Sequence, residues 1–446
     1  MNLNDLPPIF ADRMRLQLGS SSQAYFDAMQ AAPVRGIRMN PLKPVSKEAV
    51  NGLGASVPWN PLNGYYLSAE SDAGATPLHE CGAWYLQEPS AMAPVAVLNP
   101  QPGETILDLC AAPGGKSTQI GERMHGEGLL VCNEPVPSRA KILSRNIERM
   151  GISNSLVVSA DPSVLCKKWP ETFTAVLVDA PCSGEGMFRR HPETCAEWTP
   201  ESAMQCAARQ ARILDAAAQM VLPGGRMVYS TCTHNLTEDD ETVAAFLERH
   251  ADWRAVSFSL PIGEKTQEAP SGIMHLYPHE AACEGHFIAF LQKEGALPKE
   301  APLEEASKQL AAPQKPLLTG YRVFAGEFGE VPLPNAMMGD TALSVSKLPP
   351  IKGLTVLRAG IQLGAMKGKV FIPDHALALA LPTDAKVQRY SVTQKQAAQY
   401  QRGEVLAVPE ALKGFLLPCL QGLPLGFGKA VEGQLKNHYP KGLRRP

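Results

Sequence analysis

Several features that often assign a chain of this length to a class are missing from the sequence. None of its ten cysteines belongs to a Cys-x-x-Cys pair, which argues against structural zinc, and their scatter over 446 residues argues against a disulfide framework. No apolar run is long enough to cross a membrane, and Met1 to Pro8 lack the basic and apolar segments of a signal peptide. We therefore expect a cytoplasmic chain with reduced thiols and no membrane partner.

An excess of positive charge is also absent. The formal net charge is −2, so a nucleic-acid partner has to be held by local basic patches rather than by overall attraction. No histidine has a neighbour at metal-ligand spacing, so we expect no metal. What is present is an ordinary globular balance, with 44% hydrophobic and 19% charged residues, in a chain long enough for more than one domain.

The segment 84–295 alternates between apolar β-branched runs and amphipathic stretches. This alternation predicts the α/β class, with a Rossmann-like, doubly wound and mostly parallel sheet. Strands are expected at 105–110, 128–134, 156–161, 176–179, 226–232 and 286–291, and helices at 138–150, 201–221 and 238–250. The residues expected on the inward face of the helix 201–221 are Met204, Ala208, Ala211 and Leu214.

A smaller α+β module is expected before this segment, over residues 1–83. Residues 1–30 are predicted to be helical, because their large apolar side chains recur at helical spacing. Arg35 and Arg38 alternate with apolar residues along a short strand. These two arginines face either solvent or a phosphate, and the sequence does not decide between the two.

A further α+β module is expected at the other end, over 317–446. Residues 296–316 have the composition of a linker, and strands are predicted at 354–357 and 370–372. The end of the chain is basic and carries two rings, which suits a nucleic-acid strand, although a solvated tail is the favoured interpretation. The residues concerned are Lys429, Lys436, His438, Tyr439, Lys441, Arg444 and Arg445.

A nucleotide-type turn follows the first predicted strand of the segment 84–295. Its glycines let the backbone approach a ligand closely and point N–H groups at it. The spacing is neither G-x-G-x-x-G nor G-x-x-x-x-G-K, which disfavours a dehydrogenase and an ATPase. Lys116 either caps a carboxylate or faces solvent. The turn comprises Cys110, Ala111, Ala112, Pro113, Gly114, Gly115 and Lys116.

Two acids stand at the ends of the next two predicted strands. Glu134 follows Gly114 by about twenty residues, the position at which an acid takes the ribose hydroxyls of a bound nucleoside. Asp161 ends the third strand and can receive the amino group of an adenine. An adenosyl ligand without a pyrophosphate clamp indicates S-adenosylmethionine as the cofactor.

An acid and a thiol follow the strand 176–179, and a second thiol follows the strand 226–232. Asp179 and Cys182 stand in a sharp Pro/Gly turn, and Cys232 stands in Tyr-Ser-Thr-Cys-Thr. Ligands in open α/β sheets sit beyond the carboxyl ends of the strands, so we expect these three side chains to meet in an active site. The other cysteines are expected to be small buried hydrophobes or surface residues.

Three motifs in this order resemble the signature blocks of the Nop/Sun-type RNA cytosine-C5 methyltransferases. Further blocks near Tyr277 and in the C-terminal module resemble bacterial members that act on small-subunit ribosomal RNA. The three motifs are Leu107-Asp108-Leu109-Cys110-Ala111-Ala112-Pro113-Gly114-Gly115-Lys116-Ser117-Thr118, Asp179-Ala180-Pro181-Cys182-Ser183-Gly184-Glu185-Gly186 and Ser230-Thr231-Cys232-Thr233.

The resemblance implies a class I methyltransferase fold flanked by two RNA-binding modules, of which the C-terminal one is PUA-like. It implies that Cys232 adds to C6 of the target cytosine, that Cys182 assists release of the product, and that Asp179 hydrogen-bonds the base edge and borders the cofactor. Arg189 and Arg190 either contact the RNA backbone or lie in a solvated loop. The expected partner is ribosomal RNA or a small-subunit assembly intermediate, bound by a monomer.

Other functions stay open at this point. Transfer RNA is an alternative substrate. A DNA cytosine-C5 methyltransferase is disfavoured, because the chain has no Glu-Asn-Val triplet and does have the second thiol, Cys232. A catalytically silent ribosome-assembly factor is disfavoured because the glycine turn, Glu134, Asp179 and both thiols are intact.

Overall fold

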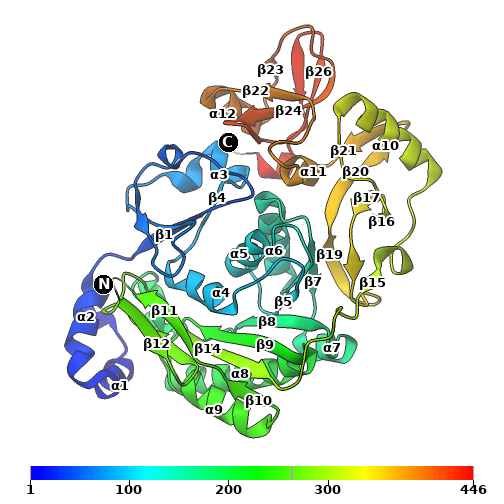
Figure 1. The fold of residues 1–446 in the computed structure, drawn as a ribbon. Coiled ribbons are helices and arrows are strands. Elements are labelled where there is room, and N and C mark those ends of the chain that lie inside the picture. The colour runs from blue at the N-terminus through cyan, green and yellow to red at the C-terminus, as the bar shows by residue number, and fades with distance from the viewer. Residues whose placement is uncertain (1, 263–264, 445–446) are drawn as a thin grey trace.

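A nine-stranded sheet lies at the centre of the molecule (Figure 1), in the order β10-β14-β9-β8-β5-β6-β7-β19 with β13 paired to β14. The computed structural model describes residues 2–262 and 265–444. The pairs among β5 to β9 are parallel, and β14, β10, β13 and β19 run antiparallel to their neighbours. The strands are β5 (Thr105–Asp108), β6 (Leu129–Asn133), β7 (Ser155–Ser159), β8 (Phe173–Asp179), β9 (Val221–Thr231), β10 (Trp253–Ala255), β13 (Ile273–Leu276), β14 (His286–Lys293) and β19 (Thr355–Ala359).

Helices cover both faces of this sheet, which confirms the predicted doubly wound α/β fold. Alternate residues of β8 enter different apolar clusters: Val176 and Val178 pack on one face, and Ala175 and Leu177 on the other. A strand that is buried on both faces needs the continuous apolar run seen in the sequence. The helices are α4 (Ala93–Leu98), α5 (Gly115–Met124), α6 (Pro137–Met150), α7 (Pro162–Lys168), α8 (Pro200–Met220) and α9 (Asp240–Arg249).

The order of the strands reverses between β5 and β8. The chain proceeds from β5 outward to β6 and β7, then returns to place β8 on the other side of β5. At such a switch point the loops after the two neighbouring strands diverge and leave a crevice at the carboxyl edge of the sheet. The glycine turn after β5 and the loop that carries Cys182 after β8 border this crevice.

The prediction for the inward face of α8 is wrong at two positions. Leu214 is buried, but Met204 is 57% exposed and Ala208 is also exposed. The buried face includes Gln210, whose side-chain nitrogen donates to the carbonyl of Pro181 at 3.0 Å. An alanine-rich helix offers several weak apolar stripes, so its sequence alone does not show which of them faces the sheet.

The N-terminal residues form three α-helices and a four-stranded sheet of order β2-β3-β1-β4. Residues 1–30 are largely helical, as predicted, and the apolar residues Phe10, Met14 and Tyr25 are fully buried and pack with Phe188 and Tyr277 of the central domain. These elements are α1 (Pro8–Leu18), α2 (Ser22–Gln30), β1 (Arg35–Met39), β2 (Leu53–Ser56), β3 (Gly64–Leu67), α3 (Pro77–Glu80) and β4 (Trp84–Leu86).

Arg38 was expected to face solvent or a phosphate, and Arg189 to contact RNA or lie in a solvated loop. Both expectations are wrong, because both arginines are buried. Arg38 is 0% exposed, and its Nε donates to Glu122 of α5 at 2.8 Å. Arg189 is 5% exposed and its Nε donates to Glu284 at 2.7 Å. Arg35 is partly exposed and donates to the carbonyl of Ser68 at 2.9 Å. Since their partners lie far away in the sequence, local patterns could not identify these ion pairs.

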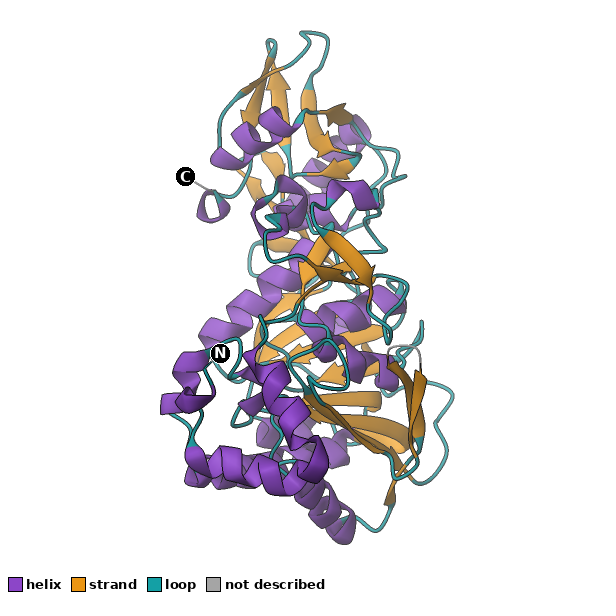
Figure 2. Ribbon diagram, turned by 90° about the vertical axis from the view of Figure 1, so that its left-hand side faces the viewer, coloured by secondary structure: helices purple, strands orange, loops and turns teal. Residues whose placement is uncertain are grey.

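The C-terminal residues form two further sheets (Figures 1 and 2), of orders β16-β17-β20-β21 and β22-β24-β26-β27-β23. The elements of this part are α10 (Lys315–Phe328), β16 (Ala336–Met338), β17 (Thr341–Ser344), β20 (Ile361–Lys367), β21 (Val370–Pro373), α11 (His375–Ala380), β22 (Arg389–Ser391), α12 (Gln394–Arg402), β23 (Leu406–Ala407), β24 (Gly414–Leu420), β25 (Leu423–Pro424), β26 (Gly428–Val431) and β27 (Gln434–Asn437). Three short pairs complete the fold: β11 (Phe258–Ile262) with β12 (Lys265–Ala269), β15 (Glu304–Glu305) with β18 (Lys347–Leu348), and β25 with β24.

One strand from the expected C-terminal module joins the central sheet. β19 pairs antiparallel with β7, and Ala359 is fully buried in the apolar cluster on one face of the sheet. The expected linker 296–316 also contains ordered structure, because Ala306 is buried in the same cluster and α10 begins at Lys315. The two halves of the chain are therefore joined by strand pairing.

The basic C-terminal end lies against the last sheet. Tyr439 is 3% exposed, and its ring packs edge-on against His375 and Tyr400, so it cannot stack on a base. Lys436 and Lys441 are exposed, and Arg445 lies outside the described residues. Among residues 2–262 and 265–444, the structure has no helix with the length and apolar character of a membrane span.

Candidate active site

The turn after β5 is shaped by Gly114, which stands at φ 115° immediately before α5. Only glycine adopts this backbone conformation readily, and a Cβ here would also lie 3.3 Å from Leu143 of α6. Asn146 of α6 holds the turn by donating from its Nδ2 to the carbonyl of Pro113 at 2.8 Å. The first N–H groups of α5 have no partner inside the helix, as at the start of any α-helix, and the turn places the start of α5 at the crevice.

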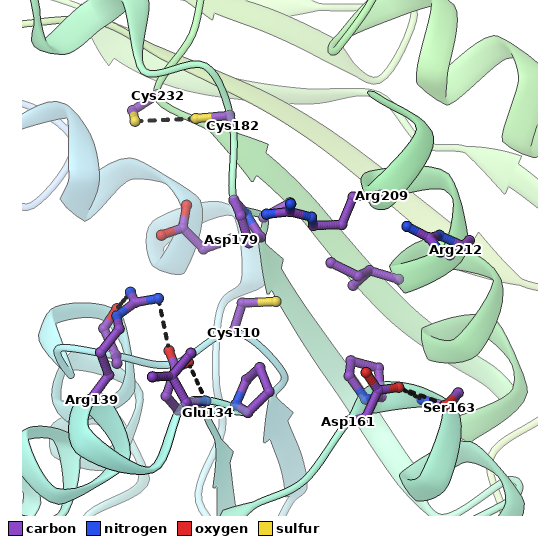
Figure 3. A pocket seen from close by; sticks show the side chains of 17 residues that line it. Cys110, Glu134, Arg139, Asp161, Ser163, Asp179, Cys182, Arg209, Arg212 and Cys232 are labelled. Atoms are coloured by element: carbon purple, nitrogen blue, oxygen red, sulfur yellow. Dashed lines mark hydrogen bonds and ion pairs between the residues drawn. The ribbon is translucent and has the colours of Figure 1, made fainter. Parts of the chain in front are cut away.

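Two adjoining cavities occupy the carboxyl edge of the sheet. The larger one, of about 790 Å³, runs from the two thiols to Glu134 and Asp161, as Figure 3 shows. The smaller one, of about 220 Å³, is lined by Asp108, Lys116 and the turn. Of the residues predicted for the site, only Gly114 lines neither cavity, since its part is to shape the turn. The others are Cys110, Ala111, Ala112, Pro113, Gly115, Lys116, Glu134, Asp161, Asp179, Cys182 and Cys232.

Glu134 and Asp161 mark the far end of the larger cavity. Glu134 is 2% exposed; its Oε1 accepts the N–H of Val136 at 2.9 Å, and its Oε2 lies 3.2 Å from Nη1 of Arg139. Asp161 caps α7 and accepts the hydroxyl of Ser163 at 2.6 Å and its N–H at 2.9 Å. These two donors lower the pKa of Asp161. Both acids therefore already have partners, and each has its backbone position fixed.

Asp179 accepts hydrogen bonds from two elements and lies beside a histidine of a third. Lys116 of α5 donates to its Oδ2 at 2.7 Å, Ser230 of β9 donates to its Oδ1 at 2.9 Å, and Nε2 of His286 on β14 lies 3.5 Å from Oδ1. Burial alone would raise the pKa of Asp179, but the Lys116 ammonium and His286 outweigh it and hold the pKa well below its ordinary value. With 32% of its side chain exposed, the carboxylate is ionised and reachable from the cavity.

The two thiols meet at the opposite end of the larger cavity (Figure 3). The Sγ atoms of Cys182 and Cys232 are 3.3 Å apart, although the residues follow different strands. The hydrogen bond to Cys232, together with burial, raises the pKa of Cys182 well above its ordinary value. The two sulfur atoms therefore share one hydrogen bond, in which either thiol can be the donor.

Buried polar contacts fix the loop that carries Cys182. Glu238 accepts the N–H of Ser183 at 2.9 Å and its hydroxyl at 2.5 Å, and it also accepts a bond from Gln210 at 2.9 Å. Glu185 is fully buried and pairs with Arg13 of α1 at 2.6 Å. The loop is thereby tied to α8, to the start of α9 and to the N-terminal helices.

Asp108, at the end of β5, provides a test of whether the smaller cavity fits a cofactor. Its Oδ2 accepts the hydroxyl of Ser117 at 2.6 Å, but its Oδ1 is buried without a partner among the described residues. Burial raises the pKa of this carboxyl to about 7. An unpaired acceptor beside the N-terminus of a helix fits a ligand that carries an ammonium and a carboxylate, as S-adenosylmethionine does.

Four residues of the site carried no assigned role in the sequence. Ser230 and His286 lie inside recognised motifs, but only the structure brings them to Asp179. Arg209 and Arg212 of α8 line the larger cavity. Their spacing of three residues places both on one face of the helix, which is the one signal that could have pointed to them.

Comparison with known proteins gives one consistent result. Residues 95–292 match the family model described as 16S rRNA methyltransferase RsmB/F. The chain is 34% identical over 466 residues to the ribosomal RNA small subunit methyltransferase F of Escherichia coli O9:H4, an alignment that covers 98% of this chain and 96% of the relative. The protein of the same name from Salmonella paratyphi A is 32% identical over 489 residues, with the same shares covered.

The chain belongs to the family of ribosomal RNA small subunit methyltransferase F. Three further family models, all specific to RsmF, match the flanking parts. Residues 6–89 match its N-terminal domain, residues 338–381 its first C-terminal domain, and residues 387–445 its PUA domain. The resemblance seen in the motifs is therefore confirmed over nearly the whole chain.

Solved structures agree on the fold of about two thirds of the chain. A methyltransferase homolog protein from Pyrococcus horikoshii is 27% identical, with a TM-score of 0.54, and covers 66% of this chain and 100% of its own. NSun6 from the same organism, solved with SFG, has a TM-score of 0.58 and the same coverage, at 20% identity.

Proposed function

We propose that this chain methylates C5 of a cytosine in small-subunit ribosomal RNA with S-adenosylmethionine, through a covalent bond between Cys232 and C6 of the base. The family membership supports the methyltransferase activity and the substrate. The separation of 3.3 Å between the Sγ atoms of Cys182 and Cys232, at the end of a cavity that also reaches Asp179, is the observation that carries the chemistry.

C5 of cytosine is a poor nucleophile, and this explains why a thiol is needed beside it. Addition of the Cys232 thiolate to C6 turns C5 into an enamine carbon, which can take a methyl group from a sulfonium. A base must then take the C5 proton, and the electron pair of that C–H bond re-forms the C5–C6 double bond while Cys232 leaves C6 as a thiolate. Cys182 lies beside the sulfur atom that is eliminated, so we assign the assistance of this release to Cys182.

Asp179 is the residue that recognises the base. An ionised carboxylate accepts hydrogen bonds from the exocyclic amino group of cytosine and from a proton on N3, and a protonated ring accepts the thiolate more readily. Lys116 and Ser230 donate to the two carboxylate oxygens, and Lys116 and His286 hold the pKa low, so the group stays ionised at neutral pH. The target base must leave its stack to reach this depth.

The glycine turn, Glu134 and Asp161 are assigned to the cofactor. When bound, S-adenosylmethionine supplies an electrophilic methyl group on a sulfonium. Glu134 would hold the ribose hydroxyls and Asp161 the adenine amino group, while Asp108 and the first N–H groups of α5 would hold the charged end of the methionine part. Lys116 then orients Asp179 rather than facing solvent.

The test is methyl transfer from labelled S-adenosylmethionine to purified small ribosomal subunits and to protein-free 16S rRNA, followed by nucleoside analysis. We expect the label in 5-methylcytidine of the RNA. The variant Cys232→Ser should give no labelled product while its Kd for S-adenosylhomocysteine stays unchanged.

Two results would contradict the proposal. Label in a nucleoside other than 5-methylcytidine would contradict methylation at C5. Full activity of Cys232→Ser would contradict the assignment of Cys232 as the nucleophile. Transfer RNA serves as the comparison substrate in the same assay, because a preference for it would replace ribosomal RNA as the substrate.

A further inference from the structure

Two arginines of α8 stand on the wall of the larger cavity between the thiols and the end marked by Asp161. Arg209 and Arg212 are both exposed, and Figure 3 shows Arg209 projecting from the helix toward Asp179. Ile213, which is buried, lines the same wall. The two guanidinium groups therefore border the space through which a substrate must reach Cys182 and Cys232.

The orientation of these arginines is fixed by the helix that carries them. Gln210 donates to the carbonyl of Pro181 and to Glu238, and both contacts belong to the network that holds the Cys182 loop. With Gln210 pointing at the loop, positions 209 and 212 fall together on the adjoining face of α8. The place of α8 beside the Cys182 loop is therefore held by buried contacts, and the two arginines project from that helix.

The charge of Arg209 and Arg212 has no counterpart in the cavity. Neither guanidinium makes a hydrogen bond or an ion pair within residues 2–262 and 265–444, whereas the cavity acids are engaged. Asp179 pairs with Lys116, Glu134 pairs with Arg139, and Asp161 caps α7. Arg212 acts on Asp161 only through a weak electrostatic contribution. Two positive charges without a hydrogen-bonded partner therefore line the larger cavity, where they can bind an anion.

We propose that Arg209 and Arg212 form a phosphate-binding site that holds the RNA backbone on either side of the target nucleotide. This inference rests on the proposed function. It assigns to α8 the binding of the phosphates of the RNA substrate. Planar guanidinium groups bind phosphate oxygens in pairs, and backbone contacts of this kind set position without reading sequence. The formal net charge of −2 makes such a local site necessary, because the whole chain does not attract RNA.

The cofactor is the other molecule that enters this cavity, and its chemistry does not suit the two arginines. S-adenosylmethionine has no phosphate, and its sulfonium and ammonium groups are repelled by a guanidinium. Its carboxylate is assigned to the turn before α5, which lines the smaller cavity, whereas Arg209 and Arg212 line the larger one. An RNA strand brings one negative charge for each nucleotide. The arginines therefore favour RNA over the cofactor, and the two ligands can be measured separately.

The experiment compares the wild-type chain with Arg209→Ala/Arg212→Ala in filter binding to a 16S rRNA transcript between 0.1 M and 1 M salt. The slope of log Kd against log salt should fall by about 0.7 for each lost phosphate contact. Over this tenfold range the double variant should therefore bind about 25-fold more weakly at 0.1 M salt. The KM for RNA should rise more than kcat falls.

Two control variants test separately whether the effect depends on the charge of the side chains and on their location in the cavity. Arg209→Lys/Arg212→Lys keeps both charges and should retain most of the salt dependence. Arg254→Ala removes one exposed charge from β10, away from the cavity, and should leave Kd and KM unchanged. The Kd for S-adenosylhomocysteine should be the same in all variants.

Three outcomes would overturn the inference. The first is an unchanged RNA Kd and KM in the double alanine variant, and the second is a loss matched by Arg254→Ala. The third is a weaker Kd for S-adenosylhomocysteine with unchanged RNA binding, which would place the arginines on the cofactor. Because binding is measured without methyl transfer, a wild-type chain that forms no 5-methylcytidine would count against the proposed function alone.

Discussion

Two thiols that follow different strands lie side by side in the site. Cys182 follows β8, and its hydrogen bond to Cys232, together with burial, raises its pKa well above the ordinary value. Cys232 follows β9, and its Sγ atom lies 3.3 Å from that of Cys182. The proposed function gives these chemically identical side chains different steps, addition to Cys232 and release to Cys182.

The first prediction concerns Cys182→Ala. Without the thiol beside the bond that must break, Cys232 can still add to the base, but release should slow. We expect turnover to fall by about 10²- to 10⁴-fold, in the range of a lost proton-transfer group, and a protein–RNA species to survive a denaturing gel. Cys182→Ala/Cys232→Ser is the matched control and should form no such species. Adduct formation in that control would assign the covalent bond to another residue.

Asp108 gives a second prediction, on stability. Burial raises its pKa from 3.8 to about 7, so between these values the folded chain holds a proton that the unfolded chain has lost. The free energy of unfolding therefore falls as pH rises through this window, and the loss is complete above pH 7. Asp108→Asn has no ionisation and should gain roughly 2–3 kcal/mol over wild type between pH 5 and pH 8.

The measurement for Asp108→Asn is urea or thermal unfolding of the cofactor-free chain at several pH values from 5 to 8. Asp161→Asn is the control, because the pKa of Asp161 is lowered and this group stays ionised in both states over that range. A difference between Asp108→Asn and wild type that stays constant with pH would contradict the assigned pKa shift.

At the scale of elements, β19 decides how the two halves of the chain depend on each other. It comes from the C-terminal half but forms the edge strand of the methyltransferase sheet, with Val356 opposite Val158 of β7. Arg358, 4% exposed, forms an ion pair with Glu148 of α6. The central sheet is therefore incomplete without residues that lie far beyond its own segment.

The third prediction tests this dependence. Ala359→Asp places a charge without a partner in the fully buried end of β19 and should cost about 3 kcal/mol or more of the methyltransferase domain's stability. Thr355→Asp adds the same charge at the exposed start of that strand and should change stability by less than about 0.5 kcal/mol. Calorimetry and methyl transfer of both variants check this. Equal melting of the two variants would mean that the catalytic sheet folds without β19.

The elements also show what the sequence could predict. The strands of 84–295 and the meeting of Asp179, Cys182 and Cys232 followed from apolar runs that end in chemically distinctive turns, since parallel strands bring such turns to one edge. The inward face of α8 and the partners of Arg38 did not follow, because alanine repeats give no periodicity and ion pairs form between distant segments. The pairing of β19 with β7, at the edge of the central sheet, could not be predicted either, because no local sequence pattern shows which strand a distant strand will pair with.

At the scale of the whole molecule, the C-terminal domain packs against the N-terminal domain. One apolar cluster contains Ile37 and Trp84 of the N-terminal sheet together with Tyr400 and Leu435 of the C-terminal domain. Gln401 of α12 also donates to the carbonyl of Pro77 at 3.2 Å, and Figure 1 shows α12 near α3. The two domains expected to bind RNA therefore share an apolar core, so neither is an independent domain attached only to the catalytic domain.

This shared core gives the last prediction. Deleting 387–446 should expose the N-terminal side of the cluster, so hydrogen exchange of the amides in β1, β3 and β4 should speed up, and RNA binding should weaken with a smaller salt dependence. Lys436→Glu/Lys441→Glu in the full chain separates the two effects, because both lysines are exposed. It should weaken RNA binding without changing exchange in the N-terminal sheet. Unchanged exchange in the deletion variant would show that the N-terminal sheet is stable without its partner, and the RNA-binding surface would then consist of two independent modules.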